Sequence, residues 1–253
     1  MAAEARGSAE NAGADAEAAG PQIMIKQVIN RLKMELPATV KLVAVSKFHP
    51  FDAIEEAYEV GQRIFAESRP QELLAKVKRL EEIRAERGEP DYMSDIEWHF
   101  IGHLQTNKLK MVLPYVSLVQ SVDSARLLDA INAWGSANGK VIDVLLEPHV
   151  AAEETKQGFA AEEIFEILSD ADRYGNVRFR GIMGMATFTD DESVIRSDFA
   201  ALRSIFEGAV SRFPGLADSF DQFSIGMSDD YPLAVEYGST MVRIGSMIFG
   251  ARQ

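Results

Sequence analysis

The chain has 253 residues, of which 47% are hydrophobic, and it carries a formal net charge of −13 with no cysteine. This length and composition are typical of a globular protein with one large core. The lack of cysteine excludes disulfides, thiolate metal sites and a catalytic thiol. The acidic balance disfavours nucleic acid as the main partner, because phosphate binding requires clustered Lys and Arg.

The first twenty residues differ in composition from the rest of the chain. Residues 1–20 are mostly Ala with Glu, Asp, Gly and Asn, and no large hydrophobic side chain follows Met1. They cannot bury enough apolar surface to offset the entropy of ordering, which predicts a disordered tail over 1–20 and a single domain over 21–253. The tail lacks the apolar core of a secretory signal, and no apolar run reaches membrane-spanning length. We therefore expect a cytoplasmic protein with no membrane partner.

Helical and strand patterns alternate through the rest of the chain. Apolar residues at helical spacing predict a first helix over 23–36, which Pro37 ends. Short apolar runs then predict strands at 40–45, 63–66, 98–101, 118–121, 141–146, 177–183, 222–225 and 241–244. The segments between them predict helices at about 51–60, 70–87, 105–112, 124–137, 160–172, 192–213 and 229–237. The helix at 70–87 is charged and amphipathic, with Glu72 and Lys76 as an i,i+4 pair.

This alternation predicts the fold class. Eight strands that alternate with helices, joined by connections too short for a second domain, favour an α/β fold of the (β/α)8 TIM barrel type. A doubly wound open sheet is the competing architecture. No Gly-x-Gly-x-x-Gly follows the first strand and there is no P-loop, so the barrel is the better interpretation. In either architecture, chemistry gathers at the carboxyl ends of the strands.

Lys47 lies just past the carboxyl end of the first predicted strand, and Pro50 stops any continuation of that strand. An ammonium that is partly desolvated at such a position has a lowered pKa, and the neutral amine can form a Schiff base with an aldehyde. A lysine at the end of a strand more often points into solvent. Other residues at the same rim must therefore decide between the two interpretations.

The segments after the last two strands suit an anion. Gly245 allows the backbone to approach an anion closely, while Ser224 and Ser246 can donate hydrogen bonds. Arg243 is permanently charged and is expected near the barrel mouth, where such barrels often bind phosphate. Taken singly, these residues are more typical of turns, caps and surface charge. Together with Lys47 they provide an amine and a phosphate cup, as an aldehyde-bearing phosphate cofactor requires.

Other candidate residues receive structural interpretations. His99 and His103 lie four residues apart, but with no further Cys, His or carboxylate cluster nearby they make a poor metal site. We expect packing and hydrogen-bonding roles for them, and no metal. Ser228 suits the N-cap of the helix at 229–237. Three methionines are expected to fill the core: Met183, Met185 and Met227.

Six segments follow one another in the order of a known family. They are Ala44-Val-Ser-Lys47 with Pro50, Phe65-x-Glu-x-Arg-x-Gln-Glu72, Trp98-His-Phe-Ile-Gly-His-Leu-Gln-x-Asn-Lys108, Ser121-Val-Asp-Ser124, Ser224-x-Gly-Met-Ser228 and Ser239-Thr-Met-Val-Arg-Ile-Gly245. They resemble the pyridoxal phosphate homeostasis proteins (the YggS/PROSC type). The resemblance covers essentially all of residues 23–252, and several of the motifs are long enough to be specific.

The resemblance implies a fold type III barrel that binds pyridoxal 5′-phosphate (PLP), like the N-terminal domain of alanine racemase. By this resemblance Lys47 would hold the cofactor as a Schiff base and Arg243 would face the pyridine nitrogen. The phosphate would be bound by Ser224, Gly245 and Ser246. The family usually has Thr at the position of Ser246, which keeps the hydroxyl.

The chain departs from the family pattern beside the second predicted strand. The family commonly has Phe-Gly-Glu-Asn-Arg where this chain has Phe65-Ala-Glu-Ser-Arg69. Ser68 in place of Asn changes a side chain expected beside the cofactor ring, so Ser68 is not counted among the expected site residues.

The same resemblance bears on whether the chain is an enzyme. Racemisation needs acid/base groups on both faces of the substrate carbon, and in the racemases the second base comes from an added β domain. This chain ends seven residues after Ser246. The prediction is therefore a non-catalytic, monomeric protein that stores, delivers and buffers PLP, with apo PLP-dependent enzymes as recipients.

Two alternatives stay open at this point. One is a PLP-dependent enzyme such as a weak amino-acid racemase, with a barrel residue as the second base. The other is a metal- or phosphosugar-dependent barrel enzyme in which Lys47 forms a Schiff base with the substrate.

Overall fold

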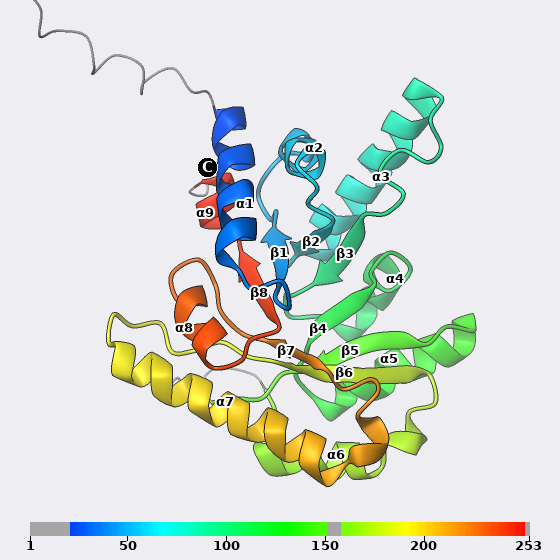
Figure 1. Ribbon diagram of the computed structural model, residues 1–253. Coiled ribbons are helices and arrows are strands. Elements are labelled where there is room, and N and C mark those ends of the chain that lie inside the picture. The colour runs from blue at the N-terminus through cyan, green and yellow to red at the C-terminus, as the bar shows by residue number, and fades with distance from the viewer. Residues whose placement is uncertain (1–20, 151–157, 251–253) are drawn as a thin grey trace, which may run out of the picture.

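The computed structural model describes residues 21–150 and 158–250, so the expected tail over 1–20 lies outside the described residues. Eight parallel strands form a closed barrel in the order β1 to β8 (Figure 1). The expected barrel is confirmed, and the open-sheet alternative is wrong. The reason is physical: each strand is short and apolar, and a helical connection after each strand returns the chain to a parallel neighbour.

The strands lie where the apolar runs predict them, with boundaries that differ by at most one residue. They are β1 (Lys41–Val45), β2 (Ile64–Glu67), β3 (Glu97–Phe100), β4 (Leu118–Val122), β5 (Ile142–Leu146), β6 (Val177–Met183), β7 (Gln222–Ser224) and β8 (Met241–Ile244).

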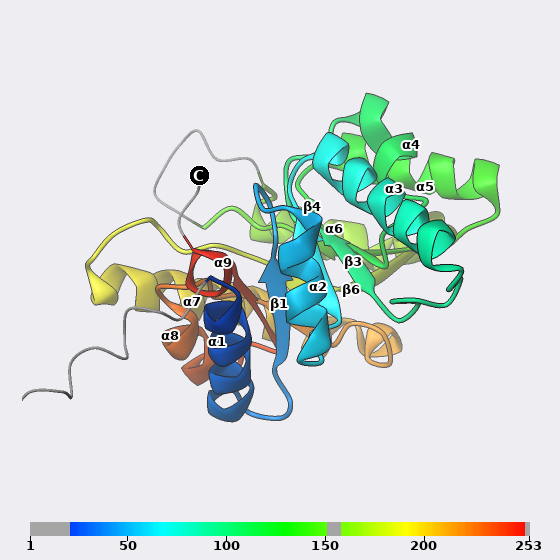
Figure 2. The ribbon, with the colours of Figure 1, turned by 90° about the horizontal axis from the view of Figure 1, so that it is seen from above.

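The helices lie outside the barrel, and α1 and α2 lie beside β1 (Figures 1 and 2). They are α1 (Pro21–Glu35), α2 (Phe51–Glu59), α3 (Pro70–Arg87), α4 (Leu109–Val112), α5 (Ala125–Asn138), α6 (Ala161–Ser169), α7 (Glu192–Arg212), α8 (Tyr231–Glu236) and α9 (Ser246–Phe249). Three short 3-10 turns are η1 (Thr106–Lys108), η2 (Ala171–Arg173) and η3 (Pro214–Leu216). The expected helix over 105–112 is divided between η1 and α4, and the short α9 was not predicted.

Alternation along β1 separates two apolar cores. Leu42 and Ala44 pack in the large core between the barrel and its helices, whereas Val43 and Val45 pack in a smaller core inside the barrel. The ladder continues one residue beyond β1, because Ser46 N donates to a carbonyl of β2. Since side chains of a strand alternate between its two faces, the next inward position is residue 47. The period of the strand therefore directs Lys47 to the barrel lumen.

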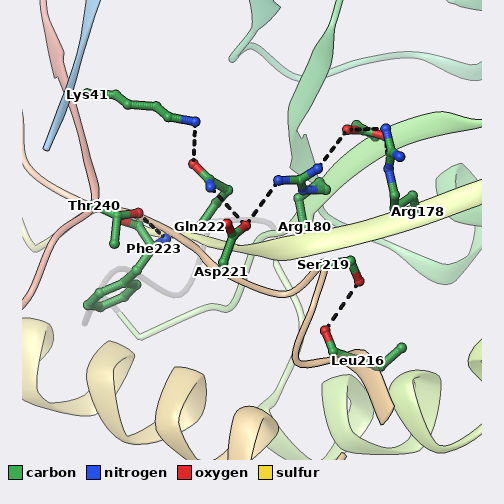
Figure 3. Close-up of polar contacts among 10 residues, drawn as sticks. Lys41, Arg178, Arg180, Leu216, Ser219, Asp221, Gln222, Phe223 and Thr240 are labelled. Carbon is green, nitrogen blue, oxygen red and sulfur yellow. Dashed lines mark hydrogen bonds and ion pairs between the residues drawn. The ribbon is translucent and has the colours of Figure 1, made fainter. Parts of the chain in front are cut away.

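The amino ends of the strands are cross-linked by charged side chains (Figure 3). Arg178 binds both carboxylate oxygens of Asp143, at 2.7 and 2.9 Å. Arg180 bridges Asp143, at 3.5 Å, and Asp221, at 3.1 Å. Arg178 and Asp221 are exposed, whereas Arg180 and Asp143 are only 24% and 16% exposed, so these pairs are only partly screened by solvent. These pairs lie at the amino-terminal end of the barrel. Function is expected at the other end, where the carboxyl ends of the strands meet.

The β7–β8 contact is short and relies on side chains. The strand register pairs Ser224 with Met241. Thr240 adds three hydrogen bonds to Phe223. Its N–H donates to Phe223 O at 2.9 Å, and its hydroxyl accepts from Phe223 N at 2.7 Å and donates to Phe223 O at 3.4 Å. The Arg243 side chain donates to Ser224 O at 2.8 Å. The contact between β7 and β8 therefore combines a short backbone ladder with side-chain hydrogen bonds from Thr240 and Arg243.

Candidate functional site

A pocket of about 310 Å³ opens at the carboxyl ends of β1, β6, β7 and β8. Four of the five predicted site residues line it: Lys47, Arg243, Gly245 and Ser246. Ser68, at the end of β2, lines it as well. The fifth predicted residue, Ser224, is completely buried and is not part of the lining. The structure therefore brings together residues that lie almost 200 positions apart in the sequence.

Lys47 occupies a tight turn between β1 and α2. The N–H of His49 donates to Ser46 O at 3.1 Å, which closes the turn around Lys47 and Phe48. Phe48 has a φ of 69°, in the left-handed region. This conformation costs a residue with a side chain about 1–2 kcal/mol, so it persists only where surrounding contacts impose it.

The buried Arg243 lies at the floor of the pocket. Its Nη1 donates to Ser224 O at 2.8 Å and to Ser224 Oγ at 2.7 Å, and its Nη2 donates to Gly184 O at 2.9 Å. Burial lowers the pKa of Arg243 to about 10, although the nearby Glu147 and Asp230 oppose this shift. Arg243 is therefore still protonated at neutral pH, and it provides a cation held in one orientation.

Ser224 acts on the pocket through Arg243. Its hydroxyl accepts from Arg243 and donates to Gln120 Oε1 at 2.7 Å. A serine has one O–H donor, and here that donor is directed into the barrel rather than towards the pocket. The predicted role of Ser224 as a direct phosphate ligand stays a prediction.

Two hydroxyl groups meet at one wall of the pocket. Ser246 Oγ donates to Ser228 Oγ at 3.1 Å, and both residues line the pocket. The expectation that Ser228 caps the following helix is wrong. That helix, α8, begins only at Tyr231, and the carboxylate of Asp230 instead accepts from Met227 N at 2.6 Å. The chain turn before α8 therefore leaves Ser228 at the pocket.

Gly245 permits β8 to approach β1 closely at the same wall. A Cβ at this position would lie 3.2 Å from Val45 O and 3.3 Å from Val45 Cβ, which is tighter than most real contacts. A side chain at residue 245 would therefore push the β8 end away from β1.

Apolar side chains from the loops after β6 and β7 form another wall. Met183, Met185 and Met227 all line the pocket. The expectation that they fill the core is right for Met183, which is buried, and wrong for Met227, which is 37% exposed. Phe188 lies at the rim and is 92% exposed. Loop residues follow no period, so the sequence pattern could not assign them to the pocket.

His49 lines the pocket beside Lys47, and sequence reasoning missed it. Its ring packs against Phe249 with centroids 5.3 Å apart. Burial, with a smaller contribution from the charge of Lys76, lowers the pKa of His49 below its usual value. His49 is therefore largely neutral at pH 7.

His99 and His103 have separate partners, which confirms the hydrogen-bonding roles expected for them. His103 Nδ1 lies 2.9 Å from Asp123 Oδ2, whereas His99 Nδ1 lies 2.9 Å from Gln120 Nε2 inside the barrel. Gln120 Oε1 accepts from Ser224, so the Gln120 amide nitrogen is the donor to His99. The Nδ1 atom of His99 is therefore an acceptor and carries no proton. Within residues 21–150 and 158–250, no three His, Cys, Asp or Glu side chains gather as metal ligands would.

We expect His99 to make the protein less stable in mild acid. Burial, and secondarily the charge of Lys41, lowers the His99 pKa to about 3 from the usual 6.5 of a histidine. Between these values the unfolded chain binds a proton that the folded chain does not, so stability falls as pH drops from 6.5 to 3. The loss at pH 5 is on the order of 2 kcal/mol.

Urea unfolding of the wild type and His99→Gln at pH 7 and pH 5 measures this contribution. The stability difference between the two pH values should be smaller in His99→Gln, because the variant lacks the titrating group. An equal difference in the two proteins would contradict the assignment.

The chemistry of the pocket follows from its donors. It combines a primary amine at Lys47, a fixed guanidinium at Arg243 and hydroxyl groups at Ser68, Ser228 and Ser246, and the carboxylate of Asp229 also lines it. An amine suits a carbonyl compound, and a guanidinium and hydroxyl groups suit an anion or a heteroatom acceptor. The set is therefore appropriate for a small, anionic aldehyde.

The chain matches the family model of the alanine racemase N-terminal domain over residues 24–253. A pyridoxal phosphate homeostasis protein of Haemophilus influenzae is 36% identical over 214 residues, which cover 85% of this chain and 86% of that protein. The human pyridoxal phosphate homeostasis protein is 38% identical over 239 residues, which cover 90% of this chain and 82% of that protein.

Solved structures show the same likeness. PipY of Synechococcus elongatus with PLP bound superposes with a TM-score of 0.79 and 31% identity, covering 89% of this chain and 100% of that one. An alanine racemase of Clostridium difficile has a TM-score of 0.70 at 13% identity, covering 90% of this chain and 56% of that one, and this likeness concerns the fold alone.

In the described part of the chain, no helix combines the length and apolar character needed to cross a membrane.

Proposed function

The chain belongs to the alanine racemase N-terminal domain family and, within it, to the pyridoxal phosphate homeostasis proteins, and from this premise we propose that its pocket binds PLP and that the protein stores, delivers and buffers this cofactor. The observation that carries the proposal is the meeting of Lys47, Arg243 and Ser246 in one pocket. When bound, PLP supplies an aldehyde carbon to which a primary amine adds with loss of water.

Each donor of the pocket has a role in this proposal. Lys47 provides the amine that holds the cofactor covalently. Arg243 faces the pyridine nitrogen, held in place by Ser224. Ser246 and the backbone at Gly245 bind the phosphate, and Ser228 joins them because its hydroxyl lies 3.1 Å from that of Ser246. The donor set fits PLP because it supplies an amine for the aldehyde, a cation for the ring nitrogen and hydroxyl donors for the phosphate.

We assign the protein a carrier role rather than an enzymatic one. Arg243 keeps its proton at neutral pH, so a pyridine nitrogen facing it would stay unprotonated, and a PLP ring bound in this way would be a weak electron sink. The walls formed by the end of β6 and the loops after β6 and β7 are mainly apolar, with Met183, Met185, Phe188 and Met227, and Asp229 is the carboxylate among them whose proton transfer the exchange experiment below tests. Racemisation would need a second proton-transfer group across from the amine. In this proposal, the recipients of PLP are apo PLP-dependent enzymes. The carrier is proposed to act in the cytoplasm and as a monomer.

Proton exchange and cofactor transfer separate the carrier from an enzyme. We expect PLP-loaded protein incubated with L-amino acids in deuterated water to exchange their α-protons no faster than free PLP does. The same loaded protein should restore the activity of an apo PLP-dependent enzyme. Nuclear magnetic resonance measures the exchange, with PLP alone as the control. Exchange at enzyme-like turnover, about 1 per second or faster, would establish the racemase-like alternative instead.

A further inference from the structure

Lys76 has an unusual position for a lysine on an amphipathic helix. It lies on the buried stripe of α3, together with Leu73, Leu80 and Ile83, and is only 7% exposed. A charge at an apolar interface between helix and barrel is costly unless it is paired and hydrogen-bonded. Its contacts must therefore explain its position.

Lys76 pairs with the end of β2 and with the turn that carries Lys47. Its Nζ donates to Glu67 Oε1 at 2.5 Å and to Ser46 O at 2.7 Å. Ser46 Oγ donates to the same Glu67 oxygen at 2.6 Å. The predicted i,i+4 pairing of Lys76 with Glu72 is thus wrong, because Lys76 is directed inward to Glu67.

Glu72 fixes the other side of the same turn. Its Oε2 accepts from Phe48 N at 2.9 Å, and its Oε1 lies 3.3 Å from Arg69 Nη1. The Arg69 guanidinium lies over the Phe48 ring, 4.5 Å from its centroid. Both chain neighbours of Lys47 are therefore bound to α3: Ser46 through Lys76, and the left-handed Phe48 through Glu72.

Stability does not account for the Glu67–Lys76 pair. Glu67 is completely buried, and within the described residues its Oε2 has no hydrogen-bond partner. Burial raises the pKa of Glu67, against the opposing effects of Lys76 and Ser46. A buried ion pair with an unsatisfied oxygen is often no more stable than an apolar pair of similar volume.

We propose that Glu67, Glu72 and Lys76 are positioning residues, which hold the strained turn so that the Lys47 amine is presented to the pocket. This inference rests on the proposed function in one respect, the role of Lys47 as the anchor of PLP. Its geometric part, that α3 contacts impose the turn, does not depend on any ligand.

The decisive variant replaces the pair with apolar side chains, Glu67→Leu together with Lys76→Met. We expect a melting temperature only a few degrees below that of the wild type, because no charge is left unpaired in the core and Ser46 O keeps the His49 N–H, although the Ser46 hydroxyl loses its acceptor. The affinity for PLP, measured from the visible absorption of lysine-bound cofactor, should fall about tenfold, since small displacements of a reacting group have large effects. The matched control, Arg79→Gln with Glu82→Gln, removes an exposed pair of the same helix and should change neither quantity.

A second measurement tests the turn in protein free of PLP. Glu72→Leu removes the acceptor of the Phe48 amide at a position outside the core, and hydrogen exchange of that amide should become at least about tenfold faster. Glu72→Gln keeps an acceptor oxygen and should restore both slow exchange and PLP affinity. This variant also serves if the double variant fails to fold.

The outcomes separate the two proposals. Unchanged PLP affinity and unchanged Phe48 exchange in the variants would overturn the positioning role and show that the contacts are only structural. A wild-type protein that takes up no PLP, but whose Phe48 exchange responds to Glu72→Leu, would overturn the proposed function and leave the geometric part of the inference intact.

Discussion

Replacement of Lys47 by Ala is expected to abolish the visible absorption band of protein-bound PLP and to leave, at most, weak non-covalent binding. Alternation along β1 directs Lys41 and Lys47 to the same side of the strand, but Lys47 is the one at the carboxyl end, where it lines the pocket together with Arg243 and Ser246. Only a neutral primary amine can add to the aldehyde, so Lys47→Arg should lose the band as completely as Lys47→Ala. Absorption spectra of freshly purified wild type and variants measure the effect.

Lys41→Ala is the matched control for this experiment. Lys41 belongs to the same strand but lies at the opposite end of the barrel, where its amine donates to Gln222 at 3.3 Å. The control should keep the band. Borohydride reduction followed by peptide mass mapping should place the pyridoxyl group on Lys47. A group found on another lysine, or on none, would refute the assignment of the anchor.

Replacement of Arg243 by Met is expected to weaken both the fold and PLP binding. The substitution removes the Arg243 donors to Ser224 Oγ and Gly184 O and one of two donors to Ser224 O, which keeps the Gly184 N–H at 3.0 Å. Leaving buried acceptors without donors costs about 1–3 kcal/mol each, partly offset by the removal of a buried charge, so we expect a net loss of about 3 kcal/mol. For a chain of this size this corresponds to a melting temperature lower by roughly 6–12 °C.

Calorimetry and PLP titration check the two parts of this prediction. Arg243→Lys should be intermediate, because an ammonium cannot direct two forked donors at Ser224 and Gly184 simultaneously. Arg203→Met, an exposed arginine of α7, should change neither stability nor binding. If Arg243→Met is as stable as the wild type and binds PLP equally well, then Arg243 neither stabilises the floor of the pocket nor contacts the pyridine ring of PLP.

The positions of the strands could be read from the sequence because each strand is a short apolar run bounded by turn residues. The barrel followed from the alternation of strands and helices. The helix ends were less predictable. The helix expected from residue 229 begins at Tyr231, because the Asp230 carboxylate bonds to the backbone of Met227 instead of extending the helix. The short α9 is too brief to have a period of its own.

The site could be predicted in part. Lys47 and Gly245 follow strands directly, so strand position alone places them at the barrel mouth. Met227 and Phe188 lie in loops, where neither period nor burial can be inferred. Lys76 had a detectable pattern, since it falls three residues after Leu73 and four before Leu80 on the apolar stripe of α3. A lysine at that spacing predicts a buried partner, although it does not identify Glu67.

The short β7–β8 joint links the closure of the barrel to what the pocket holds. One register pair, the backbone hydrogen bonds from Thr240 N to Phe223 O and from Arg243 N to Gly226 O, and a few side-chain hydrogen bonds join these strands. Arg243 contributes to both the joint and the pocket floor. Local opening in a fold starts where the fewest contacts must break. We therefore expect a molecule bound against Arg243 to slow the opening of this joint, and opening of the joint to weaken the binding of that molecule. In the proposed function, cofactor release and opening of the barrel would then be coupled through Arg243.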